Sequence, residues 1–247
     1  MQQPAKYFYN RLNSTNLYAN EMLRKRHDQV PFWVRTDDQF AGRGQGHHSW
    51  VTEPGLNLTG TLVIFPNNVR ASEQFMISKI FSLAAAGFLE MFIDEISLKW
   101  PNDLYAGDKK IGGILIETAI MGQFIDHAIL GLGVNINQVN FPPDIPNPIS
   151  ISALTGLKYD LKEMEDLMIE CFRNFYHLIE SGNYDLVNSQ YIKKLYRYNE
   201  YSGYRAGTET FTAKIVGVTE FGHLILQSQN GDLQTYAYQE VEYVLPS

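Results

Sequence analysis

The run from Ile96 to Asn137 constrains the fold most strongly, because nearly all of it has the composition of β-strands. Turn residues at Ala106-Gly107-Asp108 separate two apolar stretches in its first part, ISLKWPNDLYAGDKKIGGILIETAI, which predicts a hairpin. A further strand is predicted for its second part, FIDHAILGLGVNIN. The centre of the chain is therefore expected to form a sheet.

Helices are predicted on both sides of this run. Residues 72–92 and 161–182 have apolar side chains at helical spacing. Ser14 and Thr15 precede a shorter helix over 16–27, because a hydroxyl there can accept from the free N–H groups of a first turn. The other predicted elements are strands over 30–36 and 56–66, a proline-rich loop over 138–150 and a helix over 184–198.

The composition changes near residue 200, where we place a domain boundary. From Gly203 onward short apolar stretches alternate with turn signals, and Asn230-Gly231 is typical of a two-residue hairpin turn. Four or five short strands in about 45 residues favour a small barrel. The sequence thus predicts one domain over 1–200 and a second over 201–247.

Charge and composition argue against several classes of protein. The net charge is −7 with scattered lysines and arginines, whereas a protein that binds duplex nucleic acid usually carries a basic patch. No stretch approaches the roughly 18 apolar residues of a membrane span, and no secretion signal is recognised. Cys171 is the only cysteine, so neither disulfides nor a cysteine zinc site are expected. These features favour a cytoplasmic location.

A glycine-rich segment, DDQFAGRGQGHHSW, follows the predicted strand 30–36. Glycines let backbone N–H groups approach an anion or a flat ligand, and Arg43 within the segment suits a carboxylate or a phosphate. The segment lacks the Gly-Lys-Ser/Thr ending of a Walker loop, and a mobile surface turn explains the glycines about equally well. Trp50 is expected to anchor the segment. His47 and His48 are expected to be solvated rather than metal ligands.

Lysines and glycines recur in and beside the central strands. Lys99 follows one strand, Lys110 precedes the pair Gly112-Gly113, and Asn135 lies in GLGVNIN with its alternating glycines. A glycine inside a strand marks either a β-bulge or a place where a ligand approaches the backbone. Together these residues describe a sheet surface that suits a small acid beside a nucleotide phosphate, whose charge the lysines would neutralise.

Asn102 and Asp103 follow Pro101 in KWPND. A turn that ends the strand is the simpler local explanation for an Asn-Asp pair. The alternative is a carboxylate that faces Mg²⁺, the ion that normally accompanies a nucleotide triphosphate.

In combination these motifs resemble those of the biotin–protein ligases. The resemblance runs from about Ser14 to the C-terminus and includes STN, Gln39 with GRG…W, KWPND, KIGGIL.E and GLGVNIN in the family's order. That family condenses biotin with ATP to biotinyl-5′-adenylate, and then transfers biotin to a lysine of a biotin carboxyl carrier domain. The resemblance implies an α+β fold with a mixed central sheet flanked by helices (class II synthetase-like) and a small C-terminal SH3-like β-barrel.

The resemblance also implies roles for individual residues. Lys110 would bridge the biotin carboxylate and the α-phosphate, Lys99 and Arg43 would assist catalysis, and Asp103 would hold Mg²⁺. The biotin pocket would comprise Ser14, Thr15, Gln39, Gly42, Arg43, Lys110 and Gly113. The nucleotide would contact Gly44, Gln45, Trp50, Asn102 and Asn135, with the loop 138–148 ordering over it.

Two features depart from the family's pattern. Many relatives carry arginines at the positions of Gln45 and His48, where they hold the adenylate phosphate. Here one side chain is neutral and the other is charged only at lower pH, so looser retention of the intermediate is expected. Only 13 residues precede Ser14, which leaves no room for the winged-helix domain of the bifunctional members, and a ligase that does not bind DNA is expected.

Three other functions are compatible with parts of the sequence. A lipoate or octanoate ligase would share the fold, but its Arg-Arg-x-Ser-Gly-Gly-Gly loop is missing. A non-catalytic biotin- or nucleotide-binding module would release no pyrophosphate, and a transcriptional regulator would shift DNA in a gel. The resembling family includes monomers and homodimers, and the sequence does not identify the acceptor carboxylase.

Overall fold

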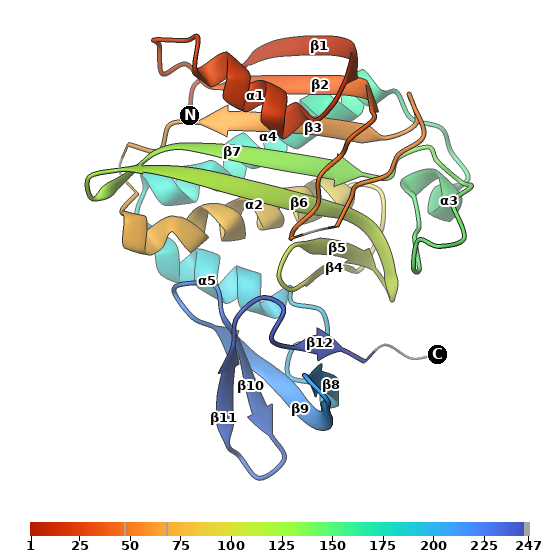
Figure 1. The fold of residues 1–247 in the computed structure, drawn as a ribbon, viewed down its shortest axis with the longest axis vertical. Coiled ribbons are helices and arrows are strands. Elements are labelled where there is room, and N and C mark those ends of the chain that lie inside the picture. Colours follow the sequence, from red (N-terminus) through yellow and green to blue (C-terminus); the bar gives the residue numbers. More distant parts are fainter. Residues whose placement is uncertain (47, 68, 245–247) are drawn as a thin grey trace.

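The larger part of the molecule is built on a mixed sheet (Figure 1). The computed structural model describes residues 1–46, 48–67 and 69–244. The seven strands lie in the order β1 (Ala5–Leu12), β2 (Phe32–Gln39), β3 (Leu58–Ile64), β7 (Phe124–Val134), β6 (Lys109–Met121), β5 (Asp103–Ala106) and β4 (Ile96–Lys99). Only β1 and β2 pair in parallel; the other neighbours are antiparallel. The predicted mixed central sheet is confirmed.

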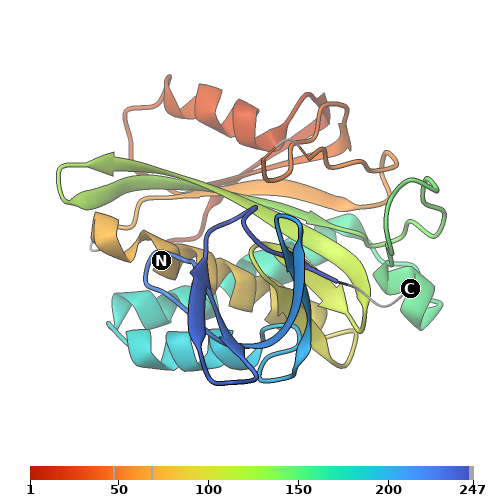
Figure 2. The ribbon, with the colours of Figure 1, turned by 60° about the horizontal axis from the view of Figure 1, so that its bottom comes forward.

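Helices lie on both faces of this sheet (Figures 1 and 2). α1 (Thr15–Leu23) lies on one face, and the other face carries α2 (Gln74–Leu89) and α4 (Leu161–Glu180). α5 (Tyr184–Lys193) packs against α2, the 3₁₀ turn η1 (Ala71–Glu73) leads into α2, and the short α3 (Ile151–Thr155) follows the proline-rich loop. Among the described residues, no helix is both long and apolar enough to span a membrane.

β3 shows how the sequence fills both sides of the sheet. All seven of its residues are buried, and successive side chains point to opposite faces. Val63 packs towards α1 in a cluster with Phe32 and Ala19, whereas Leu62 and Ile64 join the larger cluster under α2 and α4. Because each buried aliphatic side chain contributes about 1.5–3 kcal/mol, this central strand fixes the sheet between its two helical layers.

A second, antiparallel sheet follows α5. Its order is β11 (Leu233–Tyr236), β10 (Leu224–Ser228), β9 (Glu209–Val218), β8 (Ser202–Ala206) and β12 (Glu242–Tyr243). The hairpin predicted at Asn230-Gly231 is confirmed, because Gly231 has φ +96° between the paired strands β10 and β11. No ladder joins the edge strands β11 and β12 in the described part of the chain, so an open sheet stands where the sequence predicts a barrel.

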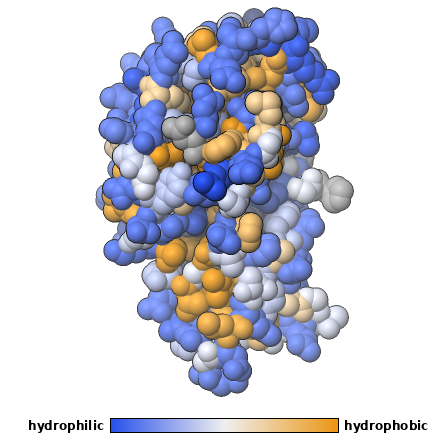
Figure 3. All heavy atoms as spheres, turned by 90° about the vertical axis from the view of Figure 1, so that its left-hand side faces the viewer, coloured by the Kyte–Doolittle hydropathy of each residue, from blue (hydrophilic) through white to orange (hydrophobic). Residues whose placement is uncertain are grey.

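The lower part of the molecule, formed by this second sheet, carries apolar surface (Figure 3). Its exposed apolar side chains include Phe221 and Leu233.

Four details differ from the sequence-based prediction. The sequence did not predict β1 or α3, because β1 is an edge strand without a regular apolar pattern and α3 has only five residues. The first helix ends at Leu23 rather than at His27, and α5 ends at Lys193 rather than at Tyr198. Arg24, Lys25 and His27 are exposed, and the Arg26 guanidinium lies 4.7 Å from the ring centroid of Phe32, so no apolar face extends the helix.

Candidate active site

A cavity of about 800 Å³ opens on the face of the large sheet that carries α1. Its walls come from the start of α1, the glycine-rich segment, β4 to β6, the loop 138–148 and the connection between β11 and β12. The predicted site residues that line it are Ser14, Thr15, Gln39, Arg43, Gly44, Gln45, Trp50, Lys99, Asn102, Asp103, Lys110, Gly113 and Asn135. Gly42 is not a lining residue, and a Cβ there would stand 2.3 Å from the backbone O of Trp50.

One cross-strand row forms the floor of the pocket. Thr59, Gly133, Gly113, Asp103 and Lys99 are successive register partners on β3, β7, β6, β5 and β4. Residues directly opposite one another project from the same face of a sheet. The floor therefore carries no side chain at its two glycines and is charged at the β4 end.

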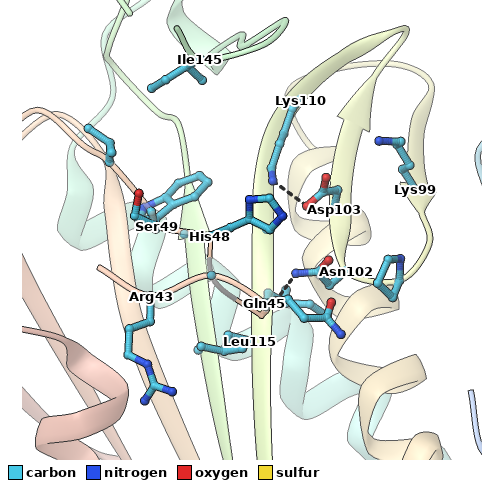
Figure 4. Close-up of a pocket in the computed structure, with 18 of the residues that line it drawn as sticks. Arg43, Gln45, His48, Ser49, Lys99, Asn102, Asp103, Lys110, Leu115 and Ile145 are labelled. Atoms are coloured by element: carbon cyan, nitrogen blue, oxygen red, sulfur yellow. Dashed lines mark hydrogen bonds and ion pairs between the residues drawn. The ribbon is translucent and has the colours of Figure 1, made fainter. Parts of the chain in front are cut away.

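A β-bulge turns Lys110 into the pocket. The register between β5 and β6 shifts, so that Asp103 opposes Gly113 while Tyr105 opposes Lys110. In a regular strand, Lys110 and Gly113 would face opposite sides, because they are three positions apart. The bulge, one of the two interpretations of the Gly112-Gly113 pair, is thus present. It brings Lys110 Nζ to 2.6 Å from Asp103 Oδ1 (Figure 4).

The floor glycines differ in what lies above them. A Cβ on Gly131 would stand 2.3 Å from Asn16 Oδ1, and one on Gly133 would stand 2.3 Å from the Trp50 ring. A Cβ on Gly113 would have Asp103 Oδ1, at 3.6 Å, as its nearest neighbour. Gly131 and Gly133 therefore make room for the protein's own side chains, whereas Gly113 faces the open pocket.

A buried polar network surrounds the first turn of α1. Gln39 Oε1 accepts from the backbone N–H of Thr15 at 2.8 Å and from its hydroxyl at 3.1 Å. The Thr61 hydroxyl lies 2.8 Å from Thr15 Oγ1 and 2.7 Å from Asn16 Oδ1. Ser14 occupies the N-cap position, but its side chain makes no capping hydrogen bond. Gln39 thus caps the helix. Asn16 Nδ2 also donates to Glu117 Oε2 at 3.1 Å, but Glu117 does not line the cavity, so the network offers neutral hydroxyl and amide groups to this end of the pocket.

We expect Thr61→Val to lower the free energy of unfolding by about 1–3 kcal/mol, because it leaves the buried Asn16 Oδ1 without its partner and removes one of the two partners of the Thr15 hydroxyl. Chemical denaturation measures the change. Thr59→Val is the matched control, because Thr59 projects from the same face but takes no part in these hydrogen bonds. Equal losses in both variants would show that the network contributes nothing.

The charged end of the pocket contains Lys99, Asp103 and Lys110. Lys99 opposes Asp103 across β4 and β5, and Asn102 Nδ2 donates to the backbone O of Ile114 at 2.9 Å. Arg43 is directed away from the Lys110–Asp103 pair in Figure 4 and lies 3.7 Å from Glu117. The structure therefore brings the predicted lysines and Asp103 together and places the Arg43 guanidinium apart from them.

The glycine-rich segment is a hydrogen-bonded turn beside the pocket. Trp50 N donates to Gly42 O at 3.0 Å, and Gly44 N donates to His48 O at 2.7 Å. Gly46 has φ +64°, which a side chain would disfavour. Trp50 lies over the backbone of Gly133, as expected of an anchor. His48 lines the pocket, and His47 lies outside the described residues.

The donor set fits Mg²⁺ bound together with phosphate. No cluster of three or more His, Cys, Asp or Glu that could hold a metal ion occurs in residues 1–46, 48–67 and 69–244. Asp103 nevertheless offers a partly exposed carboxylate inside the pocket. Mg²⁺ commonly binds through one or two carboxylates plus substrate phosphates, so Asp103 is a suitable protein ligand.

Sequence reasoning named no site residue in the second sheet, although the family resemblance suggested that this part supports the nucleotide site or docks the acceptor. Five residues from the connection into β12 line the cavity: Tyr238, Gln239, Val241, Glu242 and Tyr243. The Tyr238 hydroxyl lies 3.4 Å from the backbone O of Gln45, its acceptor. No local pattern marks these residues, because only the packing of the two sheets brings them to the pocket.

Comparisons with known proteins agree on one family. The sequence model of the biotin/lipoate A/B protein ligase family matches residues 8–135. The biotin–[acetyl-CoA-carboxylase] ligase of Paracoccus denitrificans is 27% identical over 81% of this chain and 85% of its own length. The bifunctional ligase/repressor BirA of Bacillus subtilis is 25% identical over 93% of this chain and 71% of its own.

Solved structures share the fold over nearly the whole chain. The biotin protein ligase from Aquifex aeolicus in complex with biotin and ATP superposes with a TM-score of 0.78. Its sequence is 22% identical, and the match covers 97% of this chain and 99% of that one. The biotin acetyl coenzyme A carboxylase synthetase from Helicobacter pylori gives a TM-score of 0.62 at 25% identity, covering 94% and 100% of the two chains.

Proposed function

Because the chain belongs to the biotin/lipoate A/B protein ligase family, we propose that it condenses biotin with ATP and transfers biotin to a lysine of a biotin carboxyl carrier domain. One observation carries the proposal. The Lys110–Asp103 pair, 2.6 Å apart, lies beside the bare floor at Gly113, between a neutral polar network and a charged wall. A neutral ring with a carboxylate tail, followed by a triphosphate, matches this order of groups.

The neutral end of the pocket would bind the biotin ring. Ser14, Thr15 and Gln39 are buried and offer hydroxyl and amide groups, which suit a cyclic urea that both donates and accepts hydrogen bonds. Gly113 would let the ring and its tail lie close to the backbone. The tail would then lead the carboxylate to Lys110.

Lys110 would change partners during the reaction. Without substrate its ammonium pairs with Asp103; with substrate it would lie between the biotin carboxylate and the α-phosphate. The carboxylate oxygen attacks the α-phosphorus, the bond to the leaving pyrophosphate breaks, and Lys110 neutralises charge on the phosphoryl oxygens. Mg²⁺, held by Asp103 and the phosphates, would supply further charge neutralisation.

The second half-reaction needs a closed pocket but no protein nucleophile. The amine of the acceptor lysine attacks the carbonyl carbon of the adenylate, an amide forms, and AMP leaves with the bonding electron pair. Water would destroy the mixed anhydride, so it must be excluded. The glycine-rich segment and the loop 138–148 border the cavity and are the segments that we propose cover the intermediate.

ATP–pyrophosphate exchange with and without biotin tests the proposed function. We expect exchange that depends on biotin, and biotin incorporation when a carrier domain is added. Lipoate supplied in competition separates the alternative ligase, because exchange driven by lipoate and not by biotin would overturn the proposal. Ligand binding without any exchange would instead identify a binding module.

We expect His48→Arg to slow release of the adenylate, because a guanidinium at the pocket wall carries a permanent charge and can donate two hydrogen bonds to its phosphate. His48 lines the cavity, and the size of the effect should be about 2- to 10-fold, as for a partly exposed charge contact. Trapping the released intermediate measures the rate. His223→Arg, at an exposed site outside the pocket, controls for the added charge. Unchanged release from His48→Arg would contradict the looser retention inferred from Gln45 and His48.

Three further properties stay proposals. We propose that residues 1–200 carry most of the catalytic site and that 201–247 complete it. We also propose that the enzyme works in the cytoplasm, where ATP is available. Any homodimer would use an open sheet edge such as β1. Sedimentation at several concentrations tests the last of these.

A further inference from the structure

The ammonium of Lys99 lies between two tyrosine rings. Its Nζ is 5.1 Å from the ring centroid of Tyr105 and 5.1 Å from that of Tyr243. Tyr105 belongs to β5 of the large sheet, whereas Tyr243 belongs to β12 of the second sheet. All three residues line the cavity.

Tyr243 is firmly held in this position. It opposes Tyr204 across β12 and β8, with ring centroids 5.3 Å apart, and lies 6.0 Å from the ring of Tyr196. Burial raises the pKa of Tyr243 well above its usual value, so the phenol stays neutral. Its hydroxyl is buried near the backbone of Trp100, without a hydrogen bond of good geometry. The residue therefore presents a π-face and no negative charge to Lys99.

In this arrangement the positive charge of Lys99 remains available to an anionic ligand. Asp103, the acid opposite Lys99 in the cross-strand row, is paired with Lys110. Within the described part of the chain, Lys99 itself forms no salt bridge, and its ammonium makes cation–π contacts with the two rings. A lysine side chain is flexible, and aromatic rings restrict an ammonium without neutralising it.

We propose that Tyr243 is a positioning residue, which together with Tyr105 holds the Lys99 ammonium ready for the phosphates of the nucleotide. The inference rests on the proposed function, because it assigns Lys99 to the phosphate side of the pocket. It gives the second sheet a defined part in the reaction: β12 supplies one wall of the aromatic clamp around a lysine from β4.

The test compares Tyr243→Leu with Tyr243→Phe. Loss of the ring is expected to lower kcat/KM for ATP by about 3- to 30-fold, the range of a partly desolvated cation–π contact. Tyr243→Phe keeps the ring and should stay near the wild type. The affinity for biotin, measured by calorimetry without ATP, should not change in either variant, because Lys99 lies at the other end of the pocket.

A double-mutant comparison separates positioning from general support of the fold. In a Lys99→Ala background, Tyr243→Leu should cause no further loss if Tyr243 acts through Lys99. If the losses of kcat/KM for ATP caused by the two substitutions multiply in the double variant, the proposal is wrong. It is also wrong if Tyr243→Phe loses as much as Tyr243→Leu. Tyr201→Leu is the matched control, because its ring faces the Lys214 ammonium at 5.5 Å but does not line the cavity.

If Tyr243→Leu does not fold, variants with fluorinated phenylalanines at position 243 provide a second test of the same proposal. They preserve the shape of the ring and weaken its negative face stepwise, so ATP affinity should fall with each added fluorine. A flat series would overturn the aromatic clamp. ATP affinity is measured by calorimetry without biotin, so this result stands whether or not the wild type shows biotin-dependent exchange.

Discussion

Lys110→Ala is expected to abolish biotin-dependent ATP–pyrophosphate exchange while the protein stays folded. Lys110 is the cation closest to the open floor, and loss of one such contact to a developing charge costs about 10²–10³ in rate. Its pair with Asp103 is partly exposed, and pairs of this kind contribute about 0–1 kcal/mol to stability. The melting temperature should therefore change little.

Lys109→Ala provides the matched control for this experiment. Lys109 precedes Lys110 on β6 but is exposed and does not line the cavity, so its removal should leave exchange unchanged. Normal exchange by Lys110→Ala would remove Lys110 from the mechanism. Equal loss in both variants would mean that the general charge of the strand matters, rather than the residue that the bulge turns inward.

Gly113→Val is expected to weaken biotin binding by about 10- to 200-fold, as extra methyl groups do in a fitted pocket. A Cβ at this position has ordinary contact distances, with Asp103 Oδ1 at 3.6 Å and Lys110 Cε at 3.7 Å. Valine also suits a β-strand. The side chain would therefore occupy the place of the ligand without disturbing the apo fold, and calorimetry together with a melting curve checks both statements.

The neighbouring glycine should behave in the opposite way. A Cβ on Gly112 would stand 2.7 Å from the backbone O of Gly133, which cannot move aside without breaking the sheet. Gly112→Val should therefore lower the melting temperature strongly, as overpacking does. If Gly113→Val binds biotin normally, or is destabilised as much as Gly112→Val, the floor at Gly113 is not the ligand site.

Local chemistry supplied one part of what the sequence predicted about the site, and the family resemblance supplied the roles of individual residues. Lys99, Asp103 and Lys110 lie in short motifs around turns and bulges, where the neighbouring residues largely determine the geometry, and the structure brings them together. The large helices and the central strands were likewise predictable, because their burial patterns are regular. These features depend on interactions between residues that are close in sequence.

The remainder depends on contacts that a single sequence does not encode locally. Nothing in GLGVNIN distinguishes a glycine that faces a ligand from one that accommodates Asn16 or Trp50. The edge strand β1 depends on its pairing with β2, and Tyr243 reaches Lys99 only through the docking of two sheets. The sequence therefore did not predict contacts between residues from distant segments of the chain.

The cross-strand row on the pocket floor also has a fixed length and two chemically different ends. Hydrogen-bonding groups over β3 and β7 mark its uncharged end, and Lys99 on β4 marks its cationic end. From β7 to β4 there are three inter-strand steps, about 14 Å in all. A compound with an uncharged head and an anionic tail can therefore enter in one direction only, and a non-hydrolysable inhibitor that joins the two would need a linker of that reach.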